Sequence, residues 1–137
     1  MKLLQNKIII IGCGRLGANI ANDRSKKGEN VIVVDSDKES FLKLDESFSG
    51  ITICADATDL AILEDAYIKT AKEVVVTTGD DNVNIFIAHV CRDVYDVPKI
   101  IVRLDDPSRA VLLEGKKIKG IYPLELSVSK FNIINGD

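Results

Sequence analysis

Residues 8–17 read Ile-Ile-Ile-Ile-Gly-Cys-Gly-Arg-Leu-Gly, and this stretch decides the fold of the chain. The segment from Lys7 to Ile11 is apolar after its first residue and stops at a glycine. It is too short for a helix and predicts a buried strand. The pattern G-x-G-x-x-G follows directly, and Leu16, Ile20 and Ala21 then recur at helical spacing. Such a glycine pattern is informative where it joins a strand to a helix, which is its setting here.

The three glycines of this loop each have a physical reason to be glycine. Gly12 allows a tight turn, Gly14 lets a pyrophosphate approach the backbone, and Gly17 lets the helix pack close to the sheet. Free N–H groups and the positive end of the helix would face the phosphates. The alternative is a plain turn between a strand and a helix. The predicted phosphate-binding loop comprises Gly12, Cys13, Gly14, Arg15, Leu16 and Gly17.

Short apolar runs and helical stretches alternate along the rest of the chain. Further strands are predicted at 31–34, 51–55, 74–78 and 99–104, with a weaker one at 121–124. Helices are predicted between them, one starting at a capping box formed by Ser36 and Glu39 and one at Asp106 followed by Pro107. Six strands separated by five helical segments imply a Rossmann-type three-layer α/β fold with a six-stranded parallel sheet. Residues 127–137 are polar and predict no defined element.

Composition limits the classes of function. The chain has 137 residues, which fits a single domain over 1–137, and a net charge of -3 with a pI near 5.2 gives no support for nucleic-acid binding. No apolar run approaches the roughly 20 residues of a membrane helix, and no signal peptide is seen. Cys13, Cys54 and Cys91 are expected to be small buried residues in a reducing cytoplasm. One histidine and no CxxC pair make a metal site improbable.

An acid at the end of the second predicted strand indicates what the loop binds. Asp35 lies 18 positions beyond Gly17, where a carboxylate accepts hydrogen bonds from the 2′- and 3′-hydroxyls of a ribose. It would repel a 2′-phosphate, so NADP is expected to bind poorly. The alternative is a helix-capping Asp, although Ser36 is better placed for that cap.

Polar clusters also follow the third, fourth and fifth predicted strands, where ligands bind in open parallel sheets. Turn chemistry alone can place such residues there. Arg15 would reach a phosphate or a second subunit, or would be a solvated residue on the helix. His89 lies on a mostly apolar helix, where a packed, hydrogen-bonded histidine is expected. The clusters are residues 56–58, 77–81 and 103–106.

Taken in order, these segments resemble the RCK or KTN domain, also called TrkA-N, of potassium-uptake regulators and some potassium channels. The resemblance runs from about Ile8 to Leu124. Ala55 stands where the family usually has glycine, and the usual C-terminal regulatory domain has no counterpart in these 137 residues. The matching segments are Gly12-x-Gly14-Arg15-x-Gly17, Val-Ile-Val-Val-Asp35, Ala55-Asp56-Ala57-Thr58, Thr78-Gly79-Asp80-Asp81-x-x-Asn84 and Arg103-x-x-Asp106-Pro107.

The resemblance implies a cytoplasmic, non-enzymatic regulatory domain that binds NAD(H), ATP or ADP, with AMP also possible. It implies dimers or rings on the inner face of the membrane, beside a potassium transporter or channel subunit. The phosphates would lie at the glycine loop and the ribose at Asp35. The other residues that the resemblance places around the nucleotide are Ser36, Asp56, Ala57, Thr58, Thr78, Gly79, Asp80 and Arg103.

Two other functions remain open on the sequence. One is an NAD-dependent oxidoreductase, although the chain offers no second domain to form a substrate site. The other is a nucleotide sensor unrelated to potassium transport that shares only the fold. The helix predicted over 83–94 is apolar on most sides, and self-association is a plausible use for its second face.

Overall fold

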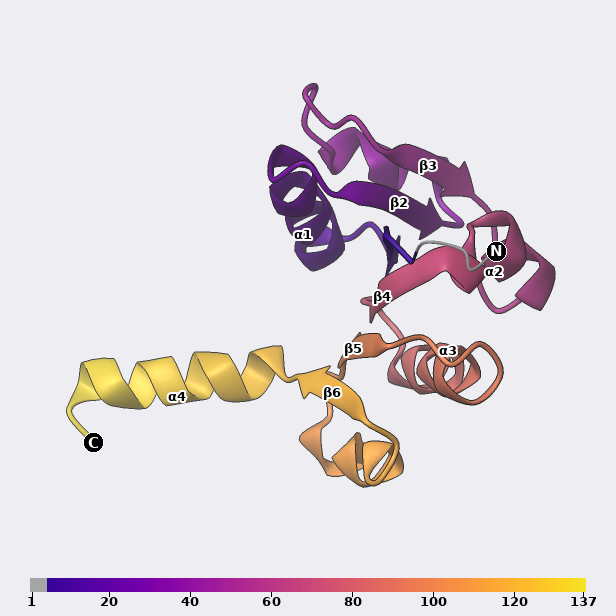
Figure 1. Cartoon of the computed structure of the whole chain (residues 1–137). Helices are drawn as coiled ribbons and strands as arrows, with labels where there is room; N and C mark the ends of the chain where they lie inside the picture. Colours follow the sequence, from indigo (N-terminus) through magenta and orange to yellow (C-terminus); the bar gives the residue numbers. More distant parts are fainter. Residues whose placement is uncertain (1–4) are drawn as a thin grey trace.

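The structure, a computed structural model, describes residues 5–137, and these form a six-stranded parallel sheet with helices on both faces (Figure 1). The predicted Rossmann-type fold is confirmed. The strands are β1 (Lys7–Ile11), β2 (Asn30–Asp35), β3 (Ile51–Cys54), β4 (Ala71–Val76), β5 (Lys99–Arg103) and β6 (Ile118–Ile121). The helices are α1 (Arg15–Lys26), α2 (Leu60–Asp65), α3 (Asp81–Asp93) and α4 (Pro123–Asn135), with the 3₁₀ helices η1 (Lys38–Lys43), η2 (Ile68–Thr70) and η3 (Pro107–Leu113).

The strand order is β3-β2-β1-β4-β5-β6, and every neighbouring pair is parallel. The chain builds outward from β1 to β3, then returns to the other side of β1 with β4. This reversal makes the boundary between β1 and β4 the switch point of the sheet. Ligands of open α/β sheets bind at such a point, beyond the carboxyl ends of the strands.

The sheet is buried on both faces, which explains why β1 is a continuous apolar run. Ile8 and Ile10 pack on one face with Ala18 of α1. Ile9 and Ile11 point to the opposite face, into the larger core that α2 and α3 cover. All four isoleucines are essentially inaccessible to solvent. Successive residues of β1 therefore contribute to the cores on both faces of the sheet, directly before the glycine loop.

The C-terminal part of the chain differs from the prediction. The sixth strand spans Ile118–Ile121, not 121–124. Pro123 lies in the first turn of α4, where its missing N–H costs nothing and its fixed φ suits a helix. The segment 127–137, to which the sequence pattern assigned no element, is helical as far as Asn135. No residue of α4 is buried. The helix therefore has no apolar stripe facing the rest of the chain from which the sequence could have predicted it.

The predicted capping box at Ser36 is also wrong. Asp37 is the N-cap, and its carboxylate accepts the Glu39 N–H at 3.0 Å. The cap falls one residue later than predicted because the Asp35 carboxylate accepts the Asp37 N–H at 2.8 Å. The element that follows is the short 3₁₀ helix η1 instead of an α-helix reaching Phe48. Apolar residues in and after η1 still pack on the α1 side of the sheet, namely Phe41, Leu44 and Phe48.

Smaller predictions have mixed outcomes. Cys13 and Cys91 are buried as expected, whereas Cys54 is exposed because β3 is an edge strand. Burial raises the pKa of the Cys91 thiol to about 12. The Asp106 cap and the following proline are confirmed at η3. Among residues 5–137, no helix has the length and apolar character needed to cross a membrane.

Candidate functional site

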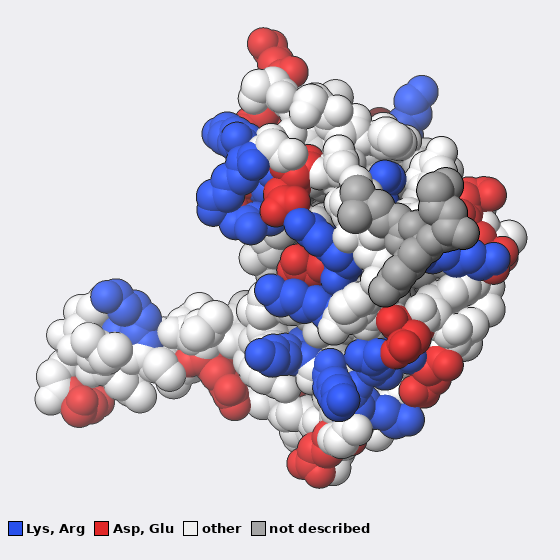
Figure 2. Space-filling view, viewed as in Figure 1, with Lys and Arg blue, Asp and Glu red and all other residues white. Residues whose placement is uncertain are grey.

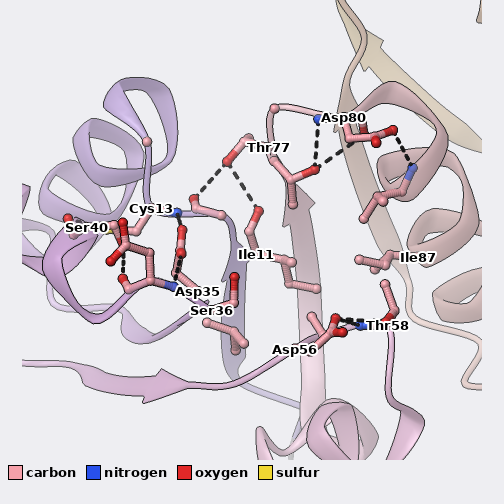
Figure 3. A pocket seen from close by; sticks show the side chains of 18 of the residues that line it. Ile11, Cys13, Asp35, Ser36, Ser40, Asp56, Thr58, Thr77, Asp80 and Ile87 are labelled. Atoms are coloured by element: carbon pink, nitrogen blue, oxygen red, sulfur yellow. Dashed lines mark hydrogen bonds between the residues drawn. The ribbon is translucent and has the colours of Figure 1, made fainter.

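A cavity of about 670 Å³ lies at the carboxyl edge of the sheet, over the ends of β1 to β5 (Figure 3). This volume is within the range of roughly 300–1,000 Å³ that is typical of small-molecule sites. The cavity brings together residues from loops far apart in the sequence. The predicted site residues that line it are Gly12, Cys13, Gly14, Asp35, Ser36, Asp56, Ala57, Thr58, Thr78, Gly79, Asp80 and Arg103.

Three predicted site residues do not line the cavity. Arg15 is exposed on the first turn of α1, and Leu16 is half-buried. Gly17 is buried, and a Cβ there would lie 1.9 Å from the Gly12 carbonyl oxygen. Gly17 therefore allows α1 to pack close to the sheet, as predicted, instead of touching a ligand.

Gly12 and Gly14 have different structural requirements. Gly12 has a φ of 98°, and a Cβ there would lie 2.8 Å from the Thr77 backbone. Gly14 has ordinary backbone angles, and apart from Gly14 itself and its two chain neighbours, no heavy atom of residues 5–137 lies within 4 Å of the position of its Cβ. The fold therefore needs glycine at 12 but not at 14. The space above Gly14 opens into the cavity.

The N-terminus of α1 is open toward this space. Its N-cap is Gly14, which offers no side chain to the first N–H groups, and the first turn carries no acidic residue. By contrast, the N-terminus of α3 is capped by the Asp80 carboxylate, which accepts two backbone N–H groups. Unsatisfied N–H groups and the positive end of a helix favour an anion. The arrangement at α1 therefore suits a phosphate group.

Asp35 joins the glycine loop to the turn after β2. Its carboxylate accepts the Cys13 N–H at 2.7 Å and the Asp37 N–H at 2.8 Å (Figure 3). The carboxylate is not a helix cap, since Asp37 has that role. Each carboxylate oxygen has a second lone pair, so Asp35 can still accept hydrogen bonds from ligand hydroxyls. Burial and the charge of Asp35 raise the pKa of the Cys13 thiol.

The loop after β3 forms the next part of the cavity wall. Asp56 accepts hydrogen bonds from the Thr58 N–H at 2.9 Å and from the Thr58 hydroxyl at 2.7 Å. These two bonds hold the pKa of Asp56 below its usual value, so its carboxyl is ionised at neutral pH. Ala57, between them, is buried beneath the cavity.

Thr77 connects the two halves of the site at the switch point. Its N–H donates to the Ile11 carbonyl at 2.7 Å, and its hydroxyl donates to the Gly12 carbonyl at 3.0 Å. Thr77 is buried and lines the cavity, yet it was not among the predicted site residues. Its place in the polar cluster 77–81 was the available signal, but the predicted strand 74–78 included Thr77, whereas β4 ends at Val76.

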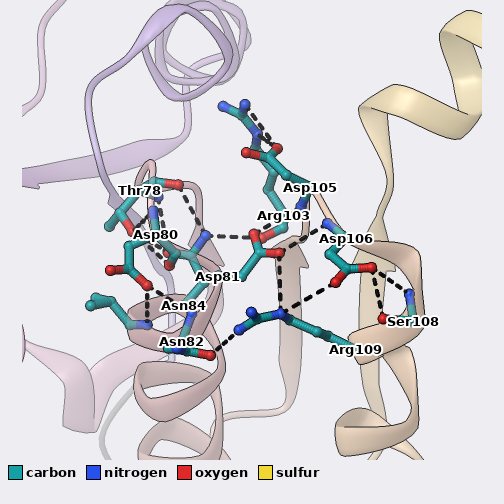
Figure 4. Close-up of polar contacts among 11 residues, drawn as sticks. Thr78, Asp80, Asp81, Asn82, Asn84, Arg103, Asp105, Asp106, Ser108 and Arg109 are labelled. Carbon is teal, nitrogen blue, oxygen red and sulfur yellow. Dashed lines mark hydrogen bonds and ion pairs between the residues drawn. The ribbon is translucent and has the colours of Figure 1, made fainter.

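The ends of β4 and β5 are joined by Asn84 of α3 (Figure 4). The Asn84 amide donates to the carbonyls of Thr78 at 3.0 Å and Arg103 at 2.9 Å. Its oxygen accepts the Thr78 N–H at 3.1 Å and also the Thr78 hydroxyl. Asn84 is fully buried. In the sequence, Asn84 is the single polar side chain in the run from Val83 to Ile87, and this position could have indicated a buried, hydrogen-bonded residue.

The cavity has charged side chains of both signs. Arg103 and Lys43 supply the cations, and the Arg103 guanidinium donates to Asp105 at 3.0 Å. Lys43 and Ser40 were not predicted as site residues, because the sequence pattern indicated an α-helix where the structure has the 3₁₀ helix η1. His89 is hydrogen-bonded to the Leu112 carbonyl at 2.8 Å and does not line the cavity, as expected of a packed histidine. The acidic residues of the lining are Asp35, Asp37, Asp56 and Asp80.

Known proteins share this sequence pattern over most of the chain. The model of the TrkA-N domain matches residues 8–122. The Trk system potassium uptake protein TrkA of Streptomyces coelicolor is 36% identical over 103 residues, which are 75% of this chain and 46% of the relative. A homolog from Pyrococcus horikoshii is 31% identical over 121 residues, 88% of this chain and 53% of the relative. The chain thus spans about half the length of these relatives.

Solved structures share the fold. The GsuK channel bound to NAD superposes with a TM-score of 0.80 at 24% identity, over 95% of this chain and 23% of the channel chain. GsuK bound to ADP gives a TM-score of 0.78 at 25% identity, over 93% of this chain and 33% of that chain. Both matches cover more than nine-tenths of this chain.

Proposed function

Because the chain belongs to the TrkA-N domain family, we propose that it is a regulatory domain of a potassium transport system that binds NAD(H), ATP or ADP at the cavity over β1 and β4. The observation that carries this proposal is the open N-terminus of α1 above Gly14, directly beside the Asp35 carboxylate. A phosphate site and a ribose acceptor at this spacing are what an adenine nucleotide requires.

In the proposed complex, the phosphates lie against the loop from Gly12 to Gly17 and the ribose against Asp35. The adenine lies toward the β3 side, near Ala57 and Thr58, and a second nucleoside extends over Thr78 and Gly79. The NAD-bound and ADP-bound structures of GsuK support both ligand classes for this fold. AMP would occupy only the first half of the cavity.

We propose that NADP is excluded. A 2′-phosphate on the ribose would lie beside the carboxylates of Asp35 and Asp37, and like charges at this separation repel. Lys43 lines the same side of the cavity and would attract a phosphate once the Asp35 charge is removed. The exclusion of NADP therefore depends mainly on Asp35.

We propose binding without chemistry. Hydride transfer needs an acid or base beside the nicotinamide. The one histidine of the chain is bonded to the Leu112 carbonyl, away from the lining residues. A regulatory role needs only different affinities in two conformational states. Arg15, exposed at the start of α1, is placed to contribute such a difference by reaching a terminal phosphate or a second subunit.

We also propose that the domain forms a homodimer, at the cytoplasmic face of a membrane potassium transporter or channel subunit. In Figure 1, α4 projects away from the sheet, and Figure 2 shows that its surface is mostly uncharged. Six large apolar side chains of α4 are at least half exposed, and Phe86 of α3 is 47% exposed. Apolar surface of this extent favours burial against a second copy. The six are Leu124, Leu126, Val128, Phe131, Ile133 and Ile134.

The thermal unfolding midpoint with NAD, NADH, ATP, ADP, AMP and NADP tests the binding proposal. A ligand at 100 times its dissociation constant adds about 2.7 kcal/mol to the free energy of unfolding. We expect NAD(H) or an adenine nucleotide to raise the midpoint, and NADP not to. Asp35→Asn should reduce the rise with NAD and allow one with NADP.

Asp59→Ala is the matched control, because it removes the α2 cap and does not touch the cavity. It should lower the midpoint but keep the ligand-induced rise. If no nucleotide changes the midpoint of the wild-type protein, the proposed function is wrong.

A further inference from the structure

The carboxyl ends of β4 and β5 are held together by a side chain instead of by the sheet. The paired residues of these two strands end at Val76 and Val102. There β4 ends, whereas β5 continues to Arg103, which pairs with Ile121 of β6. Asn84 spans this gap, donating to the Thr78 carbonyl on one side and the Arg103 carbonyl on the other. Its amide group is fully buried, and both of its polar atoms are bonded.

The first turn of α3 also holds the residues that follow Arg103. The Asp81 carboxylate accepts the Asp105 N–H at 2.8 Å and the Asp106 N–H at 2.9 Å (Figure 4). This side chain is only 11% exposed. One turn of one helix therefore positions the cavity-lining group formed by Thr78, Gly79 and Arg103, which we call the β4–β5 wall.

We propose that Asn84 is the positioning residue of the β4–β5 wall, and that it thereby sets the affinity for the second nucleoside of a dinucleotide. This inference rests on the proposed function. A dinucleotide lies across the switch point, with one half on each side of it. Asp35 lies on the β2 side, where the first nucleoside would bind. The β4–β5 wall lies on the opposite side, so only a ligand longer than AMP reaches it.

Asn84→Asp separates the shape of this side chain from its hydrogen bonding. The substitution keeps the size but replaces the two donors with a carboxylate oxygen that faces the carbonyls of Thr78 and Arg103. Both carbonyls lose their partner, so the two strand ends separate. We expect the dissociation constant for NAD to rise at least tenfold, while that for AMP changes by less than about twofold. Tenfold corresponds to about 1.4 kcal/mol, the size of one or two hydrogen bonds.

The experiment measures dissociation constants for NAD and AMP, together with the free energy of unfolding, in the wild-type protein and three variants. Asn84→Asp should lower the ratio of NAD affinity to AMP affinity at least tenfold. Asp81→Asn should lower it less, because Asn offers a single oxygen to two N–H groups. Asp59→Ala should lower stability through the lost α2 cap and leave the ratio unchanged.

Equal losses of NAD and AMP affinity in Asn84→Asp would overturn the inference, since they would indicate a general effect on folding. A wild-type protein that binds NAD no more tightly than AMP would overturn it too, because the β4–β5 wall would then contribute nothing. If Asn84→Asp does not fold, an unchanged ratio in Asp81→Asn overturns it. Wild-type protein that binds neither NAD nor AMP overturns this inference, and it contradicts the proposed function only if NADH, ATP and ADP also fail to bind. An unchanged ratio in binding-competent protein overturns this inference alone.

Discussion

Gly14 and Gly17 lie in one loop, but the structure gives them different reasons to be glycine. A Cβ on Gly17 would overlap the Gly12 carbonyl, whereas a Cβ on Gly14 would enter open space beside the cavity. The sequence pattern treats both positions alike. The structure distinguishes the glycine that the fold requires, Gly17, from the one that the proposed ligand requires, Gly14.

This difference predicts opposite results for two alanine substitutions. Gly14→Ala should leave the free energy of unfolding within about 0.5 kcal/mol of wild type and should abolish nucleotide binding, because the methyl group occupies the space for the phosphates. Gly17→Ala should destabilise the fold by roughly 1–3 kcal/mol through overpacking. Chemical denaturation and a nucleotide titration on both variants check this. Normal nucleotide affinity in Gly14→Ala would contradict the proposed phosphate site.

At the scale of elements, the sequence predicts best where burial leaves a pattern. The strands β1, β2, β4 and β5 are buried on both faces, so each is a short apolar run that ends at a polar loop. The segment after β2 was predicted less well, because Asp35 bonds the Asp37 N–H and moves the cap by one residue. That bond is a local Asx turn, which an aspartate at position 35 could have indicated, but the sequence pattern suggested its carboxylate only as a ribose acceptor or a helix cap.

The same reasoning explains what was missed in the site. Ser40 and Lys43 line the cavity from η1, a 3₁₀ helix where the sequence pattern predicted an α-helix. Asn84 was part of the family resemblance, but its partners lie 6 and 19 positions away in the sequence. Long-range hydrogen bonds of this kind leave no periodic signal. The residues at the strand ends, by contrast, were predicted because all parallel strands end at one edge of the sheet.

The backbone at Lys117, in the turn before β6, has a strained conformation, and this strain can be tested. Lys117 has a φ of 59°, in the left-handed region that side chains with a Cβ rarely adopt. Lys117→Gly should raise the free energy of unfolding by about 0.5–1 kcal/mol. The matched control is Lys119→Gly, also exposed but within β6, which should lower it by a similar amount. Denaturant titration measures both, and destabilisation by Lys117→Gly would show that the turn is not strained.

At the scale of the whole molecule, contacts within the chain do not explain why α4 is helical. The helix has 13 residues and no buried side chain, and only Glu125 and Lys130 are charged along it. An isolated helix of this length is marginal in water. Burial of its apolar side chains in the proposed dimer would stabilise the helix.

The proposed homodimer predicts how substitutions in α4 affect mass in solution. Phe131 is 61% exposed in the single chain. Phe131→Asp should convert dimers to monomers, because a carboxylate would be buried in an apolar interface. Asn132→Asp adds the same charge on the adjacent residue and should remain dimeric. Light scattering coupled to gel filtration distinguishes these outcomes. A wild-type protein that is monomeric at high concentration would contradict the dimer.

The hydrogen bonds that join the cavity walls have a kinetic consequence. Asp35 to Cys13, Thr77 to Gly12 and Asn84 to Arg103 are bonds between protein groups, so the walls do not depend on a ligand to hold their shape. In a rapid-mixing experiment, nucleotide should associate in one phase whose rate constant rises linearly with concentration and reaches no plateau. A plateau would mean that an opening step precedes binding. Single-phase association would indicate that the movement needed for the proposed regulation occurs between the subunits of the proposed dimer, not inside the domain.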